Sequence, residues 1–373
     1  MSVTCESFPS RKDPVKYEAL SKKFTMTGRN GLSAEILTYG ARIYKLFVPD
    51  KTSGELIDVM LGLEELDGYL QDGANHGAVV GRSANRIAGA SFSIDGETYH
   101  IPQNDGTNNL HTGNPAYQNK FWDGKVLSVE DAVTYVKTSG ISGLCDDESK
   151  LPLEESVLLS CVSEDGECGF PGKLITEVLY SWLKDGTFLI LYKAISDNKT
   201  VFAPTNHAYF NIEGHDHGTV SDQILTVISD KVTLKDSNNC PDGTYMDVDG
   251  TPFDFRNGAP VKQALDLTHP QIKDCKGFDQ NFCLENKGRF ELVSKLDASS
   301  KGMEVWTDMP GIQYYAGNHL GGTGYKGGAD YKPYDALCLE AQMYPNAVNI
   351  PEFESPVIEA NTPKYHACGY RFY

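Results

Sequence analysis

Four segments of the sequence concentrate side chains that can exchange protons or hold hydroxyl groups. Each sets Asn, His, Glu or Arg between small residues or prolines, where a plain strand would alternate polar and apolar side chains. These segments are 81–89, 108–111, 203–211 and 339–349, and two shorter polar segments at 277–282 and 310–318 lie between the last two. The residue types therefore favour a site built from several distant parts of the chain.

Asn, His, Gln, Asp and Arg are the side chains that a site needs to hold the hydroxyl groups of a neutral sugar, because each hydroxyl both donates and accepts a hydrogen bond. A buried polar group left unpaired costs about 1–3 kcal/mol, which allows such a site to reject wrong stereoisomers. Nearby aromatic rings can cover the apolar C–H face of a pyranose. Any one of these segments alone is more typical of an Asn- and Pro-rich structural turn than of a sugar site.

Taken together, the segments resemble the motifs of the aldose 1-epimerase family, also called galactose mutarotases, from about Gly31 to the C-terminus. The resemblance rests on Asn85-Arg86-Ile-Ala, Asn109-Leu-His111, Thr205-Asn-His207-Ala-Tyr-Phe-Asn211, Gly277-Phe-Asp279, Gln313-Tyr-Tyr-Ala-Gly-Asn318 and Leu339-Glu340-Ala-Gln-Met-Tyr-Pro345-Asn-Ala-Val-Asn349. It implies a wide sandwich of large antiparallel sheets, an open sugar cleft and no metal or other cofactor. One departure is Thr112-Gly113 after the histidine, where the family more often has paired glycines.

The same resemblance implies a role for each matching residue. His207 is the expected general acid and Glu340 the expected general base of a reaction that interconverts the α and β anomers of galactose, glucose and related aldohexoses. The residues expected to bind the sugar are Asn85, Arg86, His111, Asp279 and Gln313. We also expect partial burial beside Leu339 and Tyr344 to raise the pKa of Glu340 toward the working pH.

Strands dominate the elements that must position these residues. Short β-branched and aromatic runs alternate with turn residues, among them 36 Gly and 18 Pro, and helical periodicity is confined to short stretches near 64–71 and 261–267. Asp-Gly pairs predict three hairpins, at Asp95-Gly96, Asp185-Gly186 and Asp249-Gly250. The sequence therefore predicts an all-β fold, a large antiparallel β-sandwich with few short helices.

The chain of 373 residues is long for one domain, but β-sandwiches can exceed 200 residues as a single unit. Strand patterning continues on both sides of the polar stretch 140–155, so we interpret that stretch as an acidic surface loop. Residues 1–20 precede the family resemblance and form an N-terminal extension. We therefore predict one domain over residues 1–373.

Charge and cysteine usage restrict the partners. The formal net charge is −18, from 33 basic and 51 acidic residues, which opposes binding to nucleic acid and to anionic membranes. The nine cysteines include no CxxC pair, and no apolar stretch follows a basic patch at the N-terminus. We expect free thiols, a cytoplasmic location, a small neutral monosaccharide as partner, and a monomer or weak dimer.

Two motifs resemble functional sites only superficially. Gly322-Thr-Gly324-Tyr-Lys-Gly327 matches a dinucleotide fingerprint in spacing only, because no helix is predicted after it. His215-Asp-His217 lies in a turn-like sequence without a third ligand nearby, which favours an exposed loop over a metal site.

Two other functions stay open at this stage. A hexose-6-phosphate 1-epimerase would use the same acid and base with an added basic cluster, yet Arg82 and Arg86 are the only close arginine pair near a motif. A noncatalytic carbohydrate-binding sandwich would keep the cleft without turnover.

Overall fold

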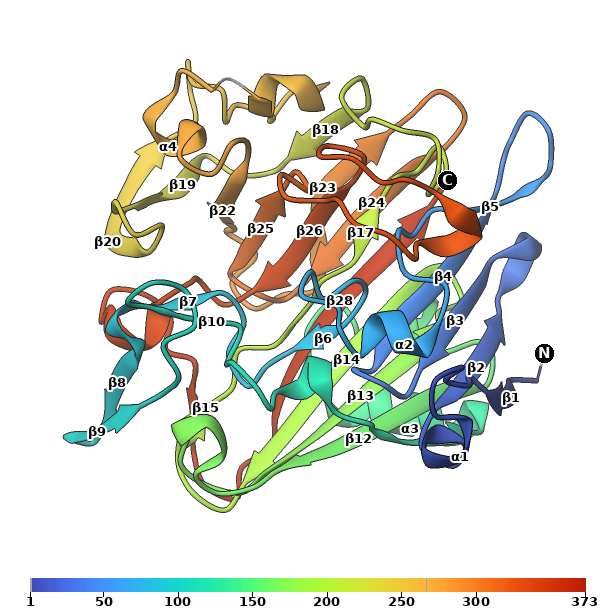
Figure 1. Cartoon of the computed structure of the whole chain (residues 1–373), viewed down its shortest axis with the longest axis horizontal. Coiled ribbons are helices and arrows are strands. Elements are labelled where there is room, and N and C mark those ends of the chain that lie inside the picture. Colours follow the sequence, from blue (N-terminus) through green and yellow to red (C-terminus); the bar gives the residue numbers. More distant parts are fainter. Residues whose placement is uncertain (1, 266) are drawn as a thin grey trace.

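Antiparallel β-sheets make up most of the computed structural model, which describes residues 2–265 and 267–373 (Figure 1). The largest sheet has nine strands in the order β11 (Asp123–Leu127), β12 (Ser156–Ser163), β13 (Leu174–Trp182), β14 (Thr187–Ser196), β28 (Lys364–Phe372), β24 (Gly302–Thr307), β23 (Glu291–Asp297), β18 (Ile224–Val227) and β21 (Ala259–Pro260). The strand-rich prediction is confirmed.

Two further sheets cover one face of the nine-stranded sheet. One has five strands in chain order, β1 (Thr4–Ser7), β2 (Lys22–Thr27), β3 (Ser33–Leu37), β4 (Arg42–Pro49) and β5 (Leu56–Asp58). The other has six strands in the order β17 (Tyr209–Phe210), β26 (Leu337–Gln342), β25 (Gly311–Tyr315), β22 (Asp279–Cys283), β19 (Lys231–Lys235) and β20 (Pro241–Asp247).

Small two-stranded pairs connect the sheets. They are β6 (Val79–Val80) with β16 (Thr205–Asn206), β7 (Arg86–Ile87) with β10 (Asn109–Leu110), β8 (Ser91–Ile94) with β9 (Glu97–His100), and β15 (Thr200–Val201) with β27 (Val357–Ile358). The described α-helices are short, namely α1 (Pro14–Tyr17), α2 (Leu66–Tyr69), α3 (Val129–Thr138) and α4 (Pro270–Lys273). Within the described residues, no helix combines the length and the apolar character that crossing a membrane requires.

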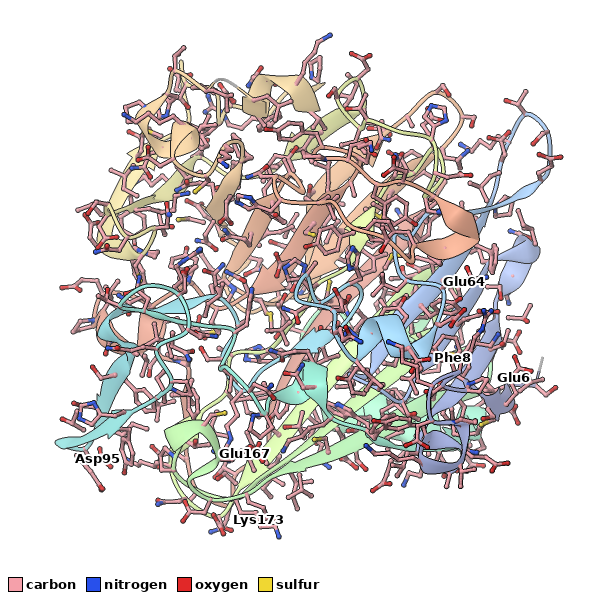
Figure 2. The ribbon with its side chains drawn as sticks, in the orientation of Figure 1. Glu6, Phe8, Glu64, Asp95, Glu167 and Lys173 are labelled. Atoms are coloured by element: carbon pink, nitrogen blue, oxygen red, sulfur yellow. The ribbon has the colours of Figure 1, made fainter. Side chains whose placement is uncertain are left out.

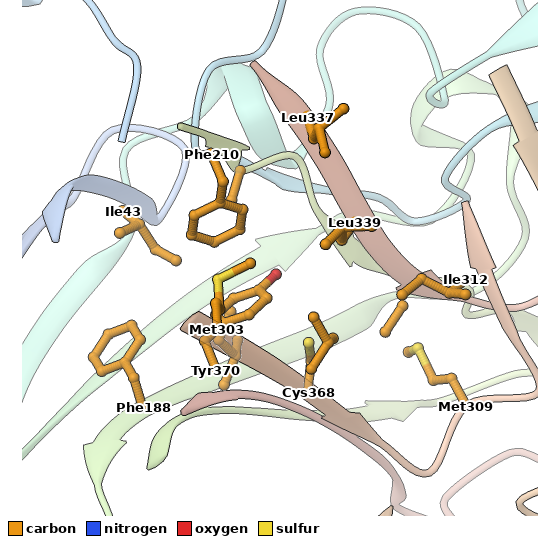
Figure 3. Close-up of a cluster of buried hydrophobic side chains, with 14 of the residues drawn as sticks. Ile43, Phe188, Phe210, Met303, Met309, Ile312, Leu337, Leu339, Cys368 and Tyr370 are labelled. Carbon is orange, nitrogen blue, oxygen red and sulfur yellow. The ribbon is translucent and has the colours of Figure 1, made fainter. Parts of the chain in front are cut away.

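The main core lies between these layers and draws side chains from all three sheets. Ile43 of the five-stranded sheet, Phe188 and Tyr370 of the nine-stranded sheet, and Ile312 and Leu339 of the six-stranded sheet belong to one buried cluster (Figure 3). Such burial contributes about 1.5–3 kcal/mol for each large apolar side chain. The predicted sharing of one strand face by Leu174, Thr176, Val178, Tyr180 and Trp182 is confirmed, since all five are buried.

The three predicted hairpins have different outcomes. Asp95 and Gly96 both have positive φ and join β8 to β9 as predicted, with Asp95 at an outer tip of the molecule (Figure 2). Between β13 and β14 the turn is longer, because the Leu183 carbonyl accepts from the Gly186 N–H. The third prediction is wrong. Pro252 lacks the N–H that a paired strand would donate, and residues after Gly250 fold into turns.

The segment 140–155 is not simply a surface loop, and this expectation needs correction. Ile141, Leu144 and Leu151 are buried in a second apolar cluster against β13 and β14. The preceding helix α3 contributes Val136 to the same cluster. The nine-stranded sheet has apolar side chains on both faces, so α3 and this segment cover the face that points away from the main core.

The other predicted helices and the extension are partly as expected. Helix α2 lies within the predicted 64–71, and Val261–Leu265 is a 3-10 helix, whereas residue 266 lies outside the described residues. The first 20 residues contribute edge strand β1, which pairs with β2, and the buried Ser10 hydroxyl donates to Asp67. The extension is therefore tied to the five-stranded sheet.

Candidate active site

A cavity of about 860 Å³ opens beside the six-stranded sheet and gathers residues from distant segments. Six of the seven predicted site residues line it: Asn85, Arg86, His111, His207, Asp279 and Glu340. The structure thus brings together six side chains that the sequence separates by up to 255 positions, 340 − 85 = 255. Gln313 is the exception.

Strand β26 positions the predicted base. Leu337, Leu339 and Ala341 point into the main core, so Glu340 and Cys338 face the opposite side of the strand. Glu340 is only 2% exposed. Leu339, which we expected beside the carboxylate, lies on the other face of the strand.

The predicted acid is held by backbone hydrogen bonds. The His207 N–H donates to the Ala78 carbonyl and the His207 carbonyl accepts from the Gly77 N–H, both at 2.8 Å. Its imidazole packs against the Tyr209 ring, with the centroids 4.9 Å apart and the planes inclined by 22°. His207 Nε2 thereby lies 3.9 Å from Glu340 Oε1.

Burial shifts the two groups in opposite directions. It raises the pKa of Glu340 well above its usual range, an effect to which the charge of Asp279 adds. It lowers the pKa of His207 to about 4, with a smaller contribution from His76. Burial therefore favours the uncharged form of each group over the charged form.

Asn85 and His111 form a second unit. Asn85 has a φ of 57°, and its backbone N–H donates to Nδ1 of His111 at 3.1 Å. Because Nδ1 accepts this bond, the ring proton of neutral His111 is on Nε2. Burial, followed by the charges of His207 and Arg86, lowers the pKa of His111 to about 3, so this histidine is a neutral hydrogen-bond donor.

Arg86 is oriented by two carboxylates. Its Nε donates to Asp105 Oδ2 at 2.7 Å, and its Nη1 lies 3.6 Å from Asp279 Oδ2. Burial opposes ionisation of Asp279, but the charges of Lys235 and Arg86 outweigh it and lower the pKa of this carboxyl. Asp279 is therefore held in its ionised form, which accepts hydrogen bonds.

Gln313 lies behind the cavity wall. Its Nε2 donates to Asp279 Oδ1 at 2.6 Å, and it lines a separate pocket of about 10 Å³ with Asn281 and Thr233. On β25 it is opposite both Asn281 and Glu340. Gln313 therefore orients Asp279, whereas the sequence predicted a direct sugar contact.

His76 is a cavity residue that the sequence analysis missed. Asp72 accepts from the His76 backbone N–H at 2.7 Å, and the Nδ1 atom of His76 lies 3.0 Å from the same carboxylate. The fully buried Arg42 lies 3.7 Å from Asp72 and donates to the His76 carbonyl. In the sequence, His76 is marked only by its place just before Gly77 and ten residues before Arg86. Periodicity cannot distinguish such a histidine from an ordinary loop residue.

The two motifs that resemble a nucleotide site and a metal site, 322–327 and 215–217, lie in loops. Residues 321–323 form part of the cavity wall, and the stretch that follows is a 3-10 turn, Lys326–Gly328, with no α-helix. His217 is exposed, while His215 is half-buried beside the Tyr331 hydroxyl at 2.9 Å. All nine cysteines are unpaired thiols, as predicted.

Fold and site together define a β-sandwich protein in which a buried histidine and a buried glutamate face each other at a polar cavity. The family model described as aldose 1-epimerase matches residues 22–371. The galactose mutarotases of Mus musculus and Homo sapiens are 36% and 34% identical to this chain over 344 residues, and each alignment covers 91% of both chains. The chain belongs to the aldose 1-epimerase family.

Solved structures agree with this assignment. The aldose epimerase homologue of C. elegans superimposes with a TM-score of 0.80 at 26% identity, covering 95% of this chain and 99% of that one. Galactose 1-epimerase of Lactobacillus acidophilus has the same TM-score at 23% identity, covers 100% and 99% of the two chains, and supports the fold alone. The resemblance and the sandwich expected from the sequence are confirmed.

Proposed function

We propose that this protein is an aldose 1-epimerase that interconverts the α and β anomers of galactose, glucose and related aldohexoses without a cofactor. The similarity to galactose mutarotases over 91% of the chain supports this activity. The observation that carries the proposal is the pairing of His207 and Glu340, whose Nε2 and Oε1 atoms lie 3.9 Å apart at the cavity.

The reaction requires one proton to leave the anomeric hydroxyl while another reaches the ring oxygen. In the proposed cycle Glu340, as a carboxylate, accepts the first proton and His207, as an imidazolium, delivers the second, which opens the hemiacetal. The reactive form is thus the charged pair, rather than the two uncharged groups that burial favours. After the C1–C2 bond turns, the two groups exchange tasks and the ring closes on the other face of the aldehyde. The cycle returns both groups to their starting state, so redox chemistry is not required.

Charge around the cleft favours a neutral sugar over a phosphorylated one. The described cavity lining has six acidic residues, Asp67, Asp72, Asp105, Asp274, Asp279 and Glu340, but only Lys12 and Arg86 as cations apart from histidines. Arg86 is already paired with two carboxylates. Arg82 is 1% exposed and is saturated by structural acceptors such as the Pro171 and Gly172 carbonyls. The hexose-6-phosphate alternative therefore lacks a phosphate clamp.

The same observations guide the remaining proposals. A net charge of −18 disfavours nucleic acid and anionic membranes as partners. Nine unpaired cysteines fit a reducing, cytoplasmic compartment. We also propose that the protein is a single domain and that it is a monomer or a weak dimer.

Polarimetry on freshly dissolved α-D-galactose tests the function directly. The expected result is accelerated decay of optical rotation that survives dialysis against EDTA, with higher kcat/KM on galactose than on galactose 6-phosphate. Binding of galactose without accelerated decay would support the noncatalytic sandwich. Preference for the phosphorylated sugar would support the related epimerase, and loss of activity on chelation would contradict a cofactor-free reaction.

A further inference from the structure

A thiol lies directly behind the acid–base pair. Cys338 precedes Glu340 by two residues on β26, and its Sγ lies 3.5 Å from Nδ1 of His207. One ligand atom from each of these three residues can be chosen so that all lie within 4.8 Å of one another. Cys338 is fully buried, and His207 and Glu340 are 6% and 2% exposed.

These three donors suit a borderline-soft divalent cation. Zinc accepts imidazole nitrogen, thiolate sulfur and carboxylate oxygen in tetrahedral sites, and its open fourth position can hold water. Bonds of about 2.0–2.3 Å set the donors about 3.3–3.8 Å apart. The three side chains would need to approach one another by about 1 Å to meet this geometry.

A second observation points to a ligand at the same place. Glu340 Oε2 is buried and has no hydrogen-bond partner among the described residues. Leaving a buried polar atom unpaired is costly, so the site gains from any group that satisfies this oxygen. Glu340 and His207 both line the cavity, which gives a cation a path from solvent to the carboxylate.

We propose that His207, Cys338 and Glu340 form an inhibitory site for thiophilic divalent cations such as Zn²⁺. On binding, the Cys338 S–H bond breaks, a metal–sulfur bond forms and the proton passes to solvent. Glu340 releases its proton in the same way when it starts protonated. The cation then occupies the lone pairs that the acid and base need for proton transfer, so cation and sugar exclude each other.

The inhibitory effect rests on the proposed function, whereas binding of the cation does not. Equilibrium dialysis of the whole protein against Zn²⁺ measures binding, and polarimetry with galactose at several Zn²⁺ concentrations measures inhibition. We expect competitive inhibition that EDTA reverses, with Mg²⁺ much weaker because it prefers oxygen ligands. If Zn²⁺ binds at Cys338 but no mutarotation occurs, the proposed function fails and the cation site stands.

Cys338→Ser is the decisive variant, because a hydroxyl can still face His207 Nδ1 while the soft ligand is lost. We expect Zn²⁺ to bind at least about tenfold more weakly. Cys168→Ser is the matched control, since Cys168 is a half-buried free thiol outside the cavity lining and its loss should leave Zn²⁺ affinity unchanged. Unchanged affinity in Cys338→Ser, or equal inhibition by Mg²⁺, would overturn the proposal.

A measurement on the unmodified protein covers the case in which the variant fails to fold. Co²⁺ bound by a thiolate shows a sulfur-to-cobalt charge-transfer absorption that oxygen and nitrogen ligands do not produce. We expect this band to appear on addition of Co²⁺ to the wild-type protein and to disappear with excess galactose. A bound Co²⁺ without the band, or a band that galactose leaves unchanged, would contradict the site.

Discussion

Asn85 fixes the tautomer of His111 by donating its backbone N–H to Nδ1 of the imidazole at 3.1 Å. Since Asn85 also precedes Arg86, one turn in the chain orients two of the residues that we propose bind the sugar. The Nε2 proton of His111 is left as the only ring donor available to a hydroxyl group.

The first prediction tests that assignment. In His111→Gln the side-chain amide can reach the former position of Nε2, whereas in His111→Asn it ends near the former position of Nδ1. We expect KM for galactose to rise about three- to tenfold in the Asn variant and less in the Gln variant. Steady-state polarimetry measures both, and equal losses would mean that Nε2 makes no sugar contact.

A second prediction concerns stability against pH. His111 has a pKa of about 3 in the folded protein against 6.5 when exposed, so only the unfolded chain takes up a proton below pH 6.5. The contribution of neutral His111 to the free energy of unfolding is therefore fully present above pH 6.5 and is lost as the pH falls toward 3. Relative to His111→Gln, the free energy of unfolding of the wild type should fall by up to about 1.4 kcal/mol per pH unit in this window.

Urea unfolding of both proteins at several pH values measures this difference. Glu340, whose raised pKa acts in the opposite sense, is present in both proteins and cancels in the comparison. A difference that stays constant across the window would show that His111 is not held neutral in the folded protein.

The third prediction concerns the proton transfers. Glu340→Gln keeps the shape of the side chain but cannot accept a proton, and His207→Asn cannot deliver one to the ring oxygen. Each should lower kcat by about 10²–10⁴-fold, and the double variant should lose far less than the product of the two factors. Calorimetric titration with galactose and thermal unfolding provide the controls. If folded Glu340→Gln retained near-normal turnover, Asp279 would be the next carboxylate to test.

A fourth prediction separates two roles for Gln313. Asp279→Ala should raise KM by about 10- to 100-fold, because a charged hydrogen-bond partner is lost. If Gln313 acts by holding Asp279, adding Gln313→Ala to that variant should change KM little further. Independent, multiplying losses in the double variant would restore the direct sugar contact that the sequence predicted.

The sequence motifs name six residues that line one cavity, because each motif is short and local. Asp279 and Glu340 lie on β22 and β26, the two strands that neighbour β25 in one sheet, and this pairing, which the sequence analysis did not predict, brings them together. The position of Gln313 was harder to predict. Whether its side chain lines the cavity or only contacts Asp279 depends on a few ångströms, which the sequence does not determine.

The sequence analysis missed helix α3 and misinterpreted the segment 140–155. Helix α3 begins at Ser128, whose side chain accepts from the Asp131 N–H, and Ser-x-x-Asp is a recognisable start for a helix. The acidic character of 140–155 concealed Leu144 and Leu151, which are isolated in sequence and become a cluster only against β13 and β14. A local capping signal therefore marks α3, whereas tertiary burial, rather than local composition, decides the structure of 140–155.

Strand β28 has a consequence for biosynthesis. It lies between β14 and β24 near the middle of the nine-stranded sheet, although it spans residues 364–372 (Figure 1). On the ribosome, the two halves of this sheet can form separately, but they cannot join until these residues have emerged. Until then, the nascent chain exposes two unpaired strand edges, and chaperones that shield such edges would act during this interval.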